Sequence, residues 1–157
     1  MDLKDLTFAA EQLLHAYTLT LDDGRYEEWP DFFTEDALYK VIARENFDRG
    51  LPLATMFCDG KGMMRDRVVA IREASIYAPA YLRHLVSSVR IAGQENESYR
   101  VESNYAVLST RHNEETKVFN AGKYLDRIVF VNGAAKFKEK VVVYDTLQIP
   151  SLLVIPI

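Results

Sequence analysis

Hydrophobic residues recur at intervals of three and four near the start of the sequence, which is the spacing of one face of an α-helix. They predict an amphipathic helix over residues 6–21, built on Leu6, Ala10, Leu13, Leu14, Tyr17 and Leu21. Gly24 follows, at a place where a helix end often adopts a positive φ. Aromatic residues then predict a second, short helix over residues 25–33, in which Pro30 either kinks the helix or begins a new turn.

The middle of the chain mixes several short patterns. Polar residues 34–36 precede the stretch ALYKVIARENF, residues 37–47, which is a predicted first strand. Residues 50–62 contain glycines and a proline without an apolar period, so we expect a loop. Met64, Val68 and Ile71 predict a third helix over residues 63–75, and Pro79 marks its end.

The second half of the chain consists of long segments rich in Val, Ile, Tyr and Phe. They cover residues 81–93, 97–111, 116–131 and 134–149, separated by the polar stretches QEN, HNEE and NG. Asn132-Gly133 is typical of a two-residue hairpin turn. Strands joined by hairpins form an antiparallel meander, and Gly122 inside one of them predicts a bulge that bends it.

This order of elements, helices first and strands last, predicts an α+β fold. A chain of 157 residues is long enough for a single domain with its own core, so we expect one domain over residues 1–157. A long, bent antiparallel sheet can curl around about three N-terminal helices and leave a cone-shaped hollow.

Composition narrows the function classes. The chain is 48% hydrophobic and 27% charged, with a net charge of −4, so nucleic acid and anionic membranes are not expected partners. No apolar run approaches the ~20 residues that cross a bilayer. The acidic N-terminus does not have the pattern of a signal peptide, and the single cysteine, Cys58, allows no internal disulfide. A cytoplasmic location is expected.

Metal and nucleotide chemistry lack their usual motifs. The sequence has no Gly-rich phosphate loop, and its histidines, His15, His84 and His112, are too far apart in sequence for a zinc-binding helix motif. Cys58 has no second cysteine with which to bind a metal cluster. We therefore expect no metal or cofactor site in this chain.

His84 is the most informative lone residue. It alternates with Leu82 and Val86, so it projects from the apolar face of a predicted strand. An aspartate at the end of the first helix, Asp22 or Asp23, could meet it there. A carboxylate bonded to an imidazole is suited to general base catalysis, and it is equally suited to tying a helix to a sheet. Both aspartates also suit a turn before Gly24.

The C-terminal stretch IPSLLVIPI, residues 149–157, is apolar apart from Ser151. An exposed tail of this kind would promote aggregation, so we expect it to be buried. It either closes the hollow of its own domain or lies in a subunit interface. Pro150 and Pro156 argue against a central strand.

Several stretches together resemble the small (beta) subunit of aromatic-ring-hydroxylating dioxygenases. They are LDDGRYEEWPDFFTEDALYKV, MMRDRVVAIREASIYAPAYLRHLVSSVRI, VFNAGKYLDRIV and KFKEKVVVYDT, and they span nearly the whole chain. The segments EEWPDFFTEDALYKV and AGKYLDR resemble most the small subunits that act on aromatic carboxylic acids such as terephthalate, salicylate or anthranilate.

The resemblance implies a cone-shaped NTF2-like (cystatin-like) fold and a partner. That partner is a large (alpha) subunit that carries a Rieske [2Fe–2S] cluster and a mononuclear iron. The resemblance further implies a hexamer of three large and three small subunits, in which the small ones form a trimer. Electrons reach the large subunit from a reductase, sometimes through a ferredoxin. On this interpretation the chain is a non-catalytic structural subunit of an oxidoreductase complex.

The fold relatives supply an alternative. Similar cones in scytalone dehydratase and polyketide cyclases use an aspartate after the first helix and a histidine on a strand. Asp22 and His84 match these places roughly, and Tyr17 would face the same cavity. The chain would then be a stand-alone dehydratase, isomerase or cyclase. A second histidine is missing from the matching strand position, unless His112 serves. A cavity that binds a small ligand without catalysis is a third hypothesis.

Overall fold

The computed structural model describes residues 1–73, 80–146 and 154–157. The first half contains helices and two strands: α1 (Leu3–Asp22), the 3₁₀ helix η1 (Tyr26–Phe32), β1 (Phe33–Ala43), α2 (Arg44–Asp48), β2 (Met56–Asp59) and α3 (Lys61–Glu73). The second half contains four long strands: β3 (Ala80–Glu95), β4 (Ser98–Arg111), β5 (Lys117–Val131) and β6 (Ala134–Tyr144). The fold is therefore α+β, as the element order predicts.

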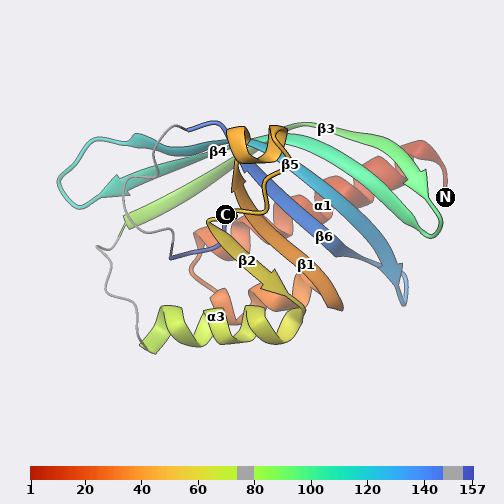
Figure 1. The fold of residues 1–157 in the computed structure, drawn as a ribbon, viewed down its shortest axis with the longest axis horizontal. Helices are drawn as coiled ribbons and strands as arrows, with labels where there is room; N and C mark the ends of the chain where they lie inside the picture. Colours follow the sequence, from red (N-terminus) through yellow and green to blue (C-terminus); the bar gives the residue numbers. More distant parts are fainter. Residues whose placement is uncertain (74–79, 147–153) are drawn as a thin grey trace.

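The strands form one curved sheet in the order β2-β1-β6-β5-β4-β3 (Figure 1). Strands β3 to β6 pair antiparallel in sequence order, which confirms the predicted meander. The sheet is nevertheless not antiparallel throughout, because β1 pairs with β6 in parallel. Local patterns do not encode the direction in which strands far apart in sequence pair, and so the sequence could not reveal this contact.

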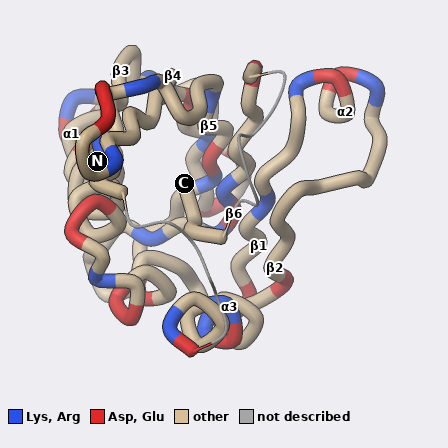
Figure 2. The backbone as a smooth tube through the Cα atoms, turned by 90° about the vertical axis from the view of Figure 1, so that its left-hand side faces the viewer, with Lys and Arg blue, Asp and Glu red and all other residues tan. Residues whose placement is uncertain are grey.

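The helices α1 and α3 lie on the same side of the sheet, while α2 lies apart on the opposite side (Figure 2). The apolar face of α1 is buried against the sheet through Leu6, Leu14, Tyr17 and Leu21. Aromatic rings dominate this core: Trp29 packs edge-on against Tyr39 at 5.1 Å, and Tyr17 against Phe137 at 5.5 Å. Rings in such geometry stabilise a core beyond the area they bury.

Some element boundaries differ from those expected. Residues 50–62 include strand β2, whose four residues pair with β1, as well as the start of α3. The strand predicted over 37–47 begins earlier, at Phe33, and ends at Ala43, where α2 begins. A strand of four residues is too short to show a periodic pattern. Pro79 lies outside the described residues.

Turn glycines behave as the sequence predicts, but Gly122 does not. Asn132 and Gly133 have φ of 52° and 81°, as a type I′ hairpin requires, and Gly24 has φ of 68°. The register of β5 against β4 shifts between Val118 and Asn120, not at Gly122. Gly122 instead allows a close approach of neighbouring backbone, because a Cβ there would lie 2.0 Å from the Val143 carbonyl oxygen.

Candidate functional site

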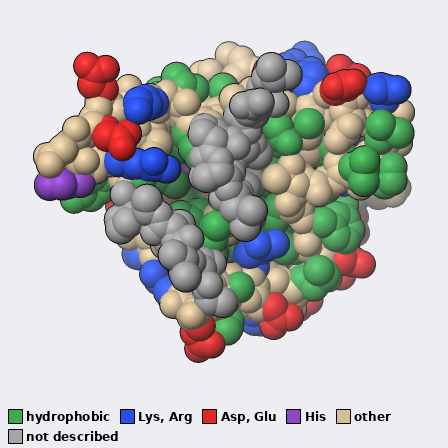
Figure 3. Space-filling model, turned by 60° about the vertical axis from the view of Figure 1, so that its left-hand side comes forward, with side chains coloured by type: hydrophobic (Ala, Val, Ile, Leu, Met, Phe, Trp, Pro, Cys, Tyr) green, Lys and Arg blue, Asp and Glu red, His purple; other side chains and the backbone are tan. Residues whose placement is uncertain are grey.

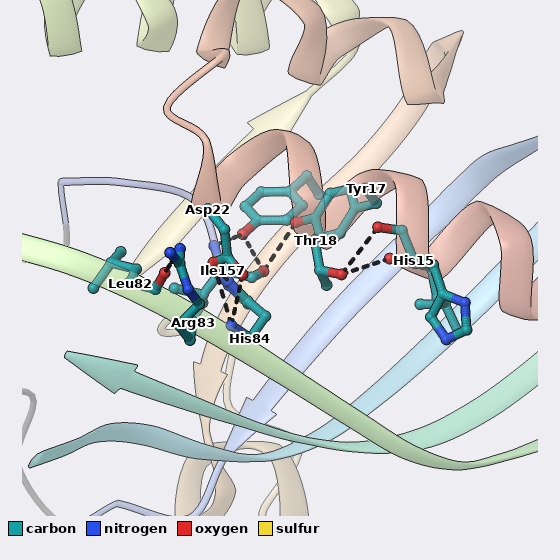
Figure 4. A network of polar contacts seen from close by, with 10 residues as sticks. His15, Tyr17, Thr18, Asp22, Leu82, Arg83, His84 and Ile157 are labelled. Carbon is teal, nitrogen blue, oxygen red and sulfur yellow. Dashed lines mark hydrogen bonds and ion pairs between the residues drawn. The ribbon is translucent and has the colours of Figure 1, made fainter. Parts of the chain in front are cut away.

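Asp22 and His84 form a compact buried pair, as Figure 4 shows. The Asp22 carboxylate lies 2.6 Å from Nδ1 of His84 and also accepts the backbone N–H of His84, at 2.9 and 3.2 Å from its two oxygens. The side chains are 7% and 0% exposed, respectively. The sequence therefore correctly predicted that these two residues meet.

The local structure explains why the pair forms. Asp22 is the last residue of α1, and α1 runs beside β3 at the edge of the sheet. The backbone N–H of His84 points away from the sheet and would have no strand partner there, so the carboxylate accepts it. Both the backbone and the ring of His84 are thus bound to α1, which fastens the helix end to the edge strand.

Tyr17, the third residue of the alternative enzyme site, has other partners. Its hydroxyl donates to the Ile157 carbonyl oxygen at 3.0 Å, and the Tyr39 hydroxyl donates to the same oxygen at 2.9 Å. Burial raises the pKa of both tyrosines well above its usual range, so both hydroxyls stay protonated donors. The structure brings together Asp22 and His84, whereas the Tyr17 hydroxyl serves the chain end.

The described part of the C-terminal stretch is buried in its own domain. Pro156 is buried, Ile157 is fully buried within the core, and Val154 and Ile155 pack against it. Figure 2 places the C-terminus between α1 and the sheet. Of the two expectations for this stretch, closure of its own hollow is therefore correct for residues 154–157. Residues 149–153, which include Pro150 and Ser151, lie outside the described residues.

A second buried polar pair was not singled out from the sequence. Lys140 and Asp126 face each other on β6 and β5, and Nζ of Lys140 lies 3.1 and 3.2 Å from the two carboxylate oxygens. The ammonium also lies 3.5 Å from the centroid of the Tyr124 ring. A signal was present, since Asp126 alternates with Tyr124 and Ile128 on the apolar face of its strand.

Burial sets the protonation of this pair. It raises the pKa of Asp126 to about 6 and lowers the pKa of Lys140 to about 8, while each charge partly opposes the shift of the other. Both groups are therefore charged between these values. The pair is almost fully buried, so it is placed to hold the strands together and not to meet a solute.

The second ring nitrogen of His84, Nε2, is buried and has no hydrogen-bond partner among the described residues. A general base must reach the proton that it removes, directly or through one water. Two surface hollows of about 250 Å³ are lined by other residues, one beside Leu125 and Val141 and one beside Cys58 and Arg67.

Metal ligands do not gather in the part of the chain that the structure describes, where no group of three or more His, Cys, Asp or Glu could hold an ion. A Rieske cluster needs two cysteines and two histidines, and a mononuclear iron site typically needs two histidines and a carboxylate. The sequence contains one cysteine, too few for a Rieske cluster, and its three histidines are fewer than the four that the two groups need together. None of the helices within the described residues is long and apolar enough to span a membrane.

Solved structures with similar folds define the class of protein. A protein from Novosphingobium aromaticivorans assigned as a scytalone dehydratase superposes with a TM-score of 0.66 at 21% identity, covering 88% of this chain and 83% of the other. At that identity the likeness shows the fold alone. The chain thus has the NTF2-like cone, a curved sheet packed around helices.

The sequence narrows this class to one family. Residues 17–151 match the family described as ring hydroxylating beta subunit. The anthranilate 1,2-dioxygenase small subunit of Burkholderia cepacia is 41% identical, covering 96% of this chain and 93% of the relative. A terephthalate 1,2-dioxygenase beta subunit of Comamonas sp is 33% identical, covering 90% and 92%.

A solved structure from Novosphingobium aromaticivorans, assigned as a beta subunit of an aromatic-ring-hydroxylating dioxygenase, has a TM-score of 0.90 at 44% identity and covers 98% of each chain. The chain belongs to the ring-hydroxylating beta subunit family and is a small subunit of an oxidoreductase complex.

Proposed function

We propose that this chain is a structural subunit without catalytic residues of its own, which assembles with a Rieske-type large subunit to oxidise an aromatic ring. The observation that carries the proposal is the use of Asp22 and His84. The carboxylate is occupied by the backbone and ring of His84, and the imidazole is fully buried. The pair therefore serves the fold.

The iron of the complex belongs to the large subunit in this proposal, because this chain has too few cysteines for a Rieske cluster and no group of metal ligands comes together among its described residues. The substrate is an aromatic carboxylate, supported by the likeness to small subunits named for anthranilate and terephthalate. Three small and three large subunits form the hexamer, a reductase or ferredoxin delivers electrons to the large subunit, and the complex is cytoplasmic.

The surface for assembly lies on the outward face of β3, β4 and β5. Tyr81, Leu85 and Val118 are 75%, 56% and 62% exposed. Arg83 is exposed between Tyr81 and Leu85 and lies opposite Leu108, which in turn lies opposite Val118. Aromatic residues and arginine are enriched where subunits meet. Exposed apolar groups also lie beside charged residues elsewhere, as the face in Figure 3 shows.

The decisive experiment compares the isolated chain with the assembled complex. The isolated chain should bind no stoichiometric iron and turn over no aromatic compound, whereas the complex oxidises its substrate. His84→Gln in the assembled complex should leave kcat within about twofold, since the residue acts only on the fold. Turnover by the isolated chain, or a loss of kcat of about a hundredfold or more in the folded His84→Gln complex, as expected for a general base, would support the stand-alone enzyme instead.

A further inference from the structure

The interior of the cone holds the end of the chain by specific contacts. The Ile157 carbonyl oxygen accepts hydrogen bonds from Tyr17 and Tyr39, and the Ile157 backbone N–H donates to the Tyr39 hydroxyl at 2.9 Å. The backbone N–H and the backbone oxygen of this residue are therefore both bound by side chains that are themselves fully buried. Apolar packing alone would not require this pairing.

Side-chain contacts complete the recognition. The Ile157 side chain is part of the main core, and Val154 and Ile155 pack against that core from the same segment. Tyr17 contributes twice, because its hydroxyl binds Ile157 and its ring lies 4.7 Å from the ammonium of Lys140. An ammonium over the face of an aromatic ring attracts it, so this contact helps to fix the position of the Tyr17 ring.

We infer that the interior of the cone is a peptide-binding pocket whose ligand is the segment 154–157 of the same chain. The ligand class is a short apolar peptide with a branched aliphatic residue, a carbonyl oxygen and an N–H. The pocket consists of Tyr17 and Tyr39 as polar contacts and of the surrounding aromatic core. The occupant belongs to the same chain as the pocket, and this covalent link gives it a high effective concentration.

Hydrogen exchange at the Ile157 amide tests this inference in the full chain. Tyr17→Phe removes a donor to the Ile157 carbonyl but leaves the acceptor of the Ile157 N–H in place. We expect the amide to be protected in the unmodified chain, and Tyr17→Phe to raise its exchange rate about fivefold, the value of one neutral hydrogen bond. Tyr105→Phe is the matched control, since the Tyr105 hydroxyl binds Asn120 and not the tail.

A free peptide tests whether the pocket recognises its ligand. A tethered segment has an effective concentration of about a few mM, so the free peptide must exceed that concentration to compete. Under this condition, the peptide Val-Ile-Pro-Ile should displace the tail and raise the exchange rate of the Ile157 amide at least twofold. The peptide Val-Ile-Pro-Gly, which lacks the final side chain, should not. An unprotected Ile157 amide, equal effects of Tyr17→Phe and Tyr105→Phe, or a lack of response to Val-Ile-Pro-Ile would each overturn the inference. None of these outcomes bears on iron binding or turnover.

Discussion

At the scale of single residues, position 122 requires a glycine because the neighbouring strand passes too close for a Cβ. A Cβ at this position would meet the Val143 carbonyl oxygen at 2.0 Å, and a backbone atom cannot move aside as a side-chain tip can. Gly122→Ala should therefore lower the free energy of unfolding by about 3 kcal/mol. Gly62→Ala is the control, because Gly62 lies in α3 with open space around it and alanine favours a helix. Chemical denaturation measures both, and equal stabilities would contradict the argument.

The buried pair of Lys140 and Asp126 should make stability depend on pH. The folded carboxyl keeps its proton up to a pKa of about 6, so stability falls as pH rises from about 4 to 6. The folded ammonium has a pKa of about 8, below its unfolded value, so stability rises as pH rises from about 8 to 10.

Substitutions separate the two charges of that pair. Asp126→Ala leaves the ammonium without its partner and should cost about 3–5 kcal/mol at pH 7, whereas Asp126→Leu with Lys140→Met should be nearly neutral and should flatten both pH ranges. Denaturant unfolding between pH 4 and 10 provides the measurement. An unchanged pH profile in the double variant would contradict the assigned titrations.

At the scale of elements, the contact between Asp22 and His84 fastens α1 to β3. Asp22→Ala leaves the His84 backbone N–H and ring without their acceptor and should cost about 2–4 kcal/mol. Because the loss is local, amide exchange should accelerate first along β3 and at the end of α1, and only later in β5 and β6. A uniform acceleration in all strands would show that the contact has no local role.

Elements with strong local patterns could be predicted from the sequence. The periodic apolar face of α1, the Asn132-Gly133 turn and the alternation around His84 each depend on neighbours in sequence, and the structure confirms them. The parallel pairing of β1 with β6 and the fate of the Tyr17 hydroxyl depend on residues more than 90 positions away. Such contacts leave no local signal, and this explains why the parallel pairing and the tyrosine contacts of Ile157 were not foreseen. Strand β2 was missed for another reason, because four residues are too few to show a periodic pattern.

At the scale of the whole molecule, the two sides of the sheet differ in what covers them. The inner side is filled by α1, the aromatic core and residues 154–157. The outer side leaves Tyr81 and Leu85 exposed on β3 and Val118 exposed on β5, with β4 between the two strands. The proposed assembly surface therefore lies on the outer side.

A charge placed on that outer surface should interfere with assembly and not with folding. Leu85→Asp should weaken co-purification with the large subunit, or self-association of the isolated chain, by at least tenfold, because an interface residue must be desolvated. Val131→Asp is the control, since Val131 is 44% exposed at the far end of β5. Normal assembly of a folded Leu85→Asp chain would move the interface elsewhere.

The buried chain end has a practical consequence for handling the protein. Ile157 is fully enclosed, whereas Met1 at the other end is 72% exposed. A purification handle fused behind Ile157 would have to pull that residue out of its two tyrosine contacts to reach solvent. Fusions in front of Met1 leave the packing intact, and they are the choice for any pull-down or surface-immobilised assay.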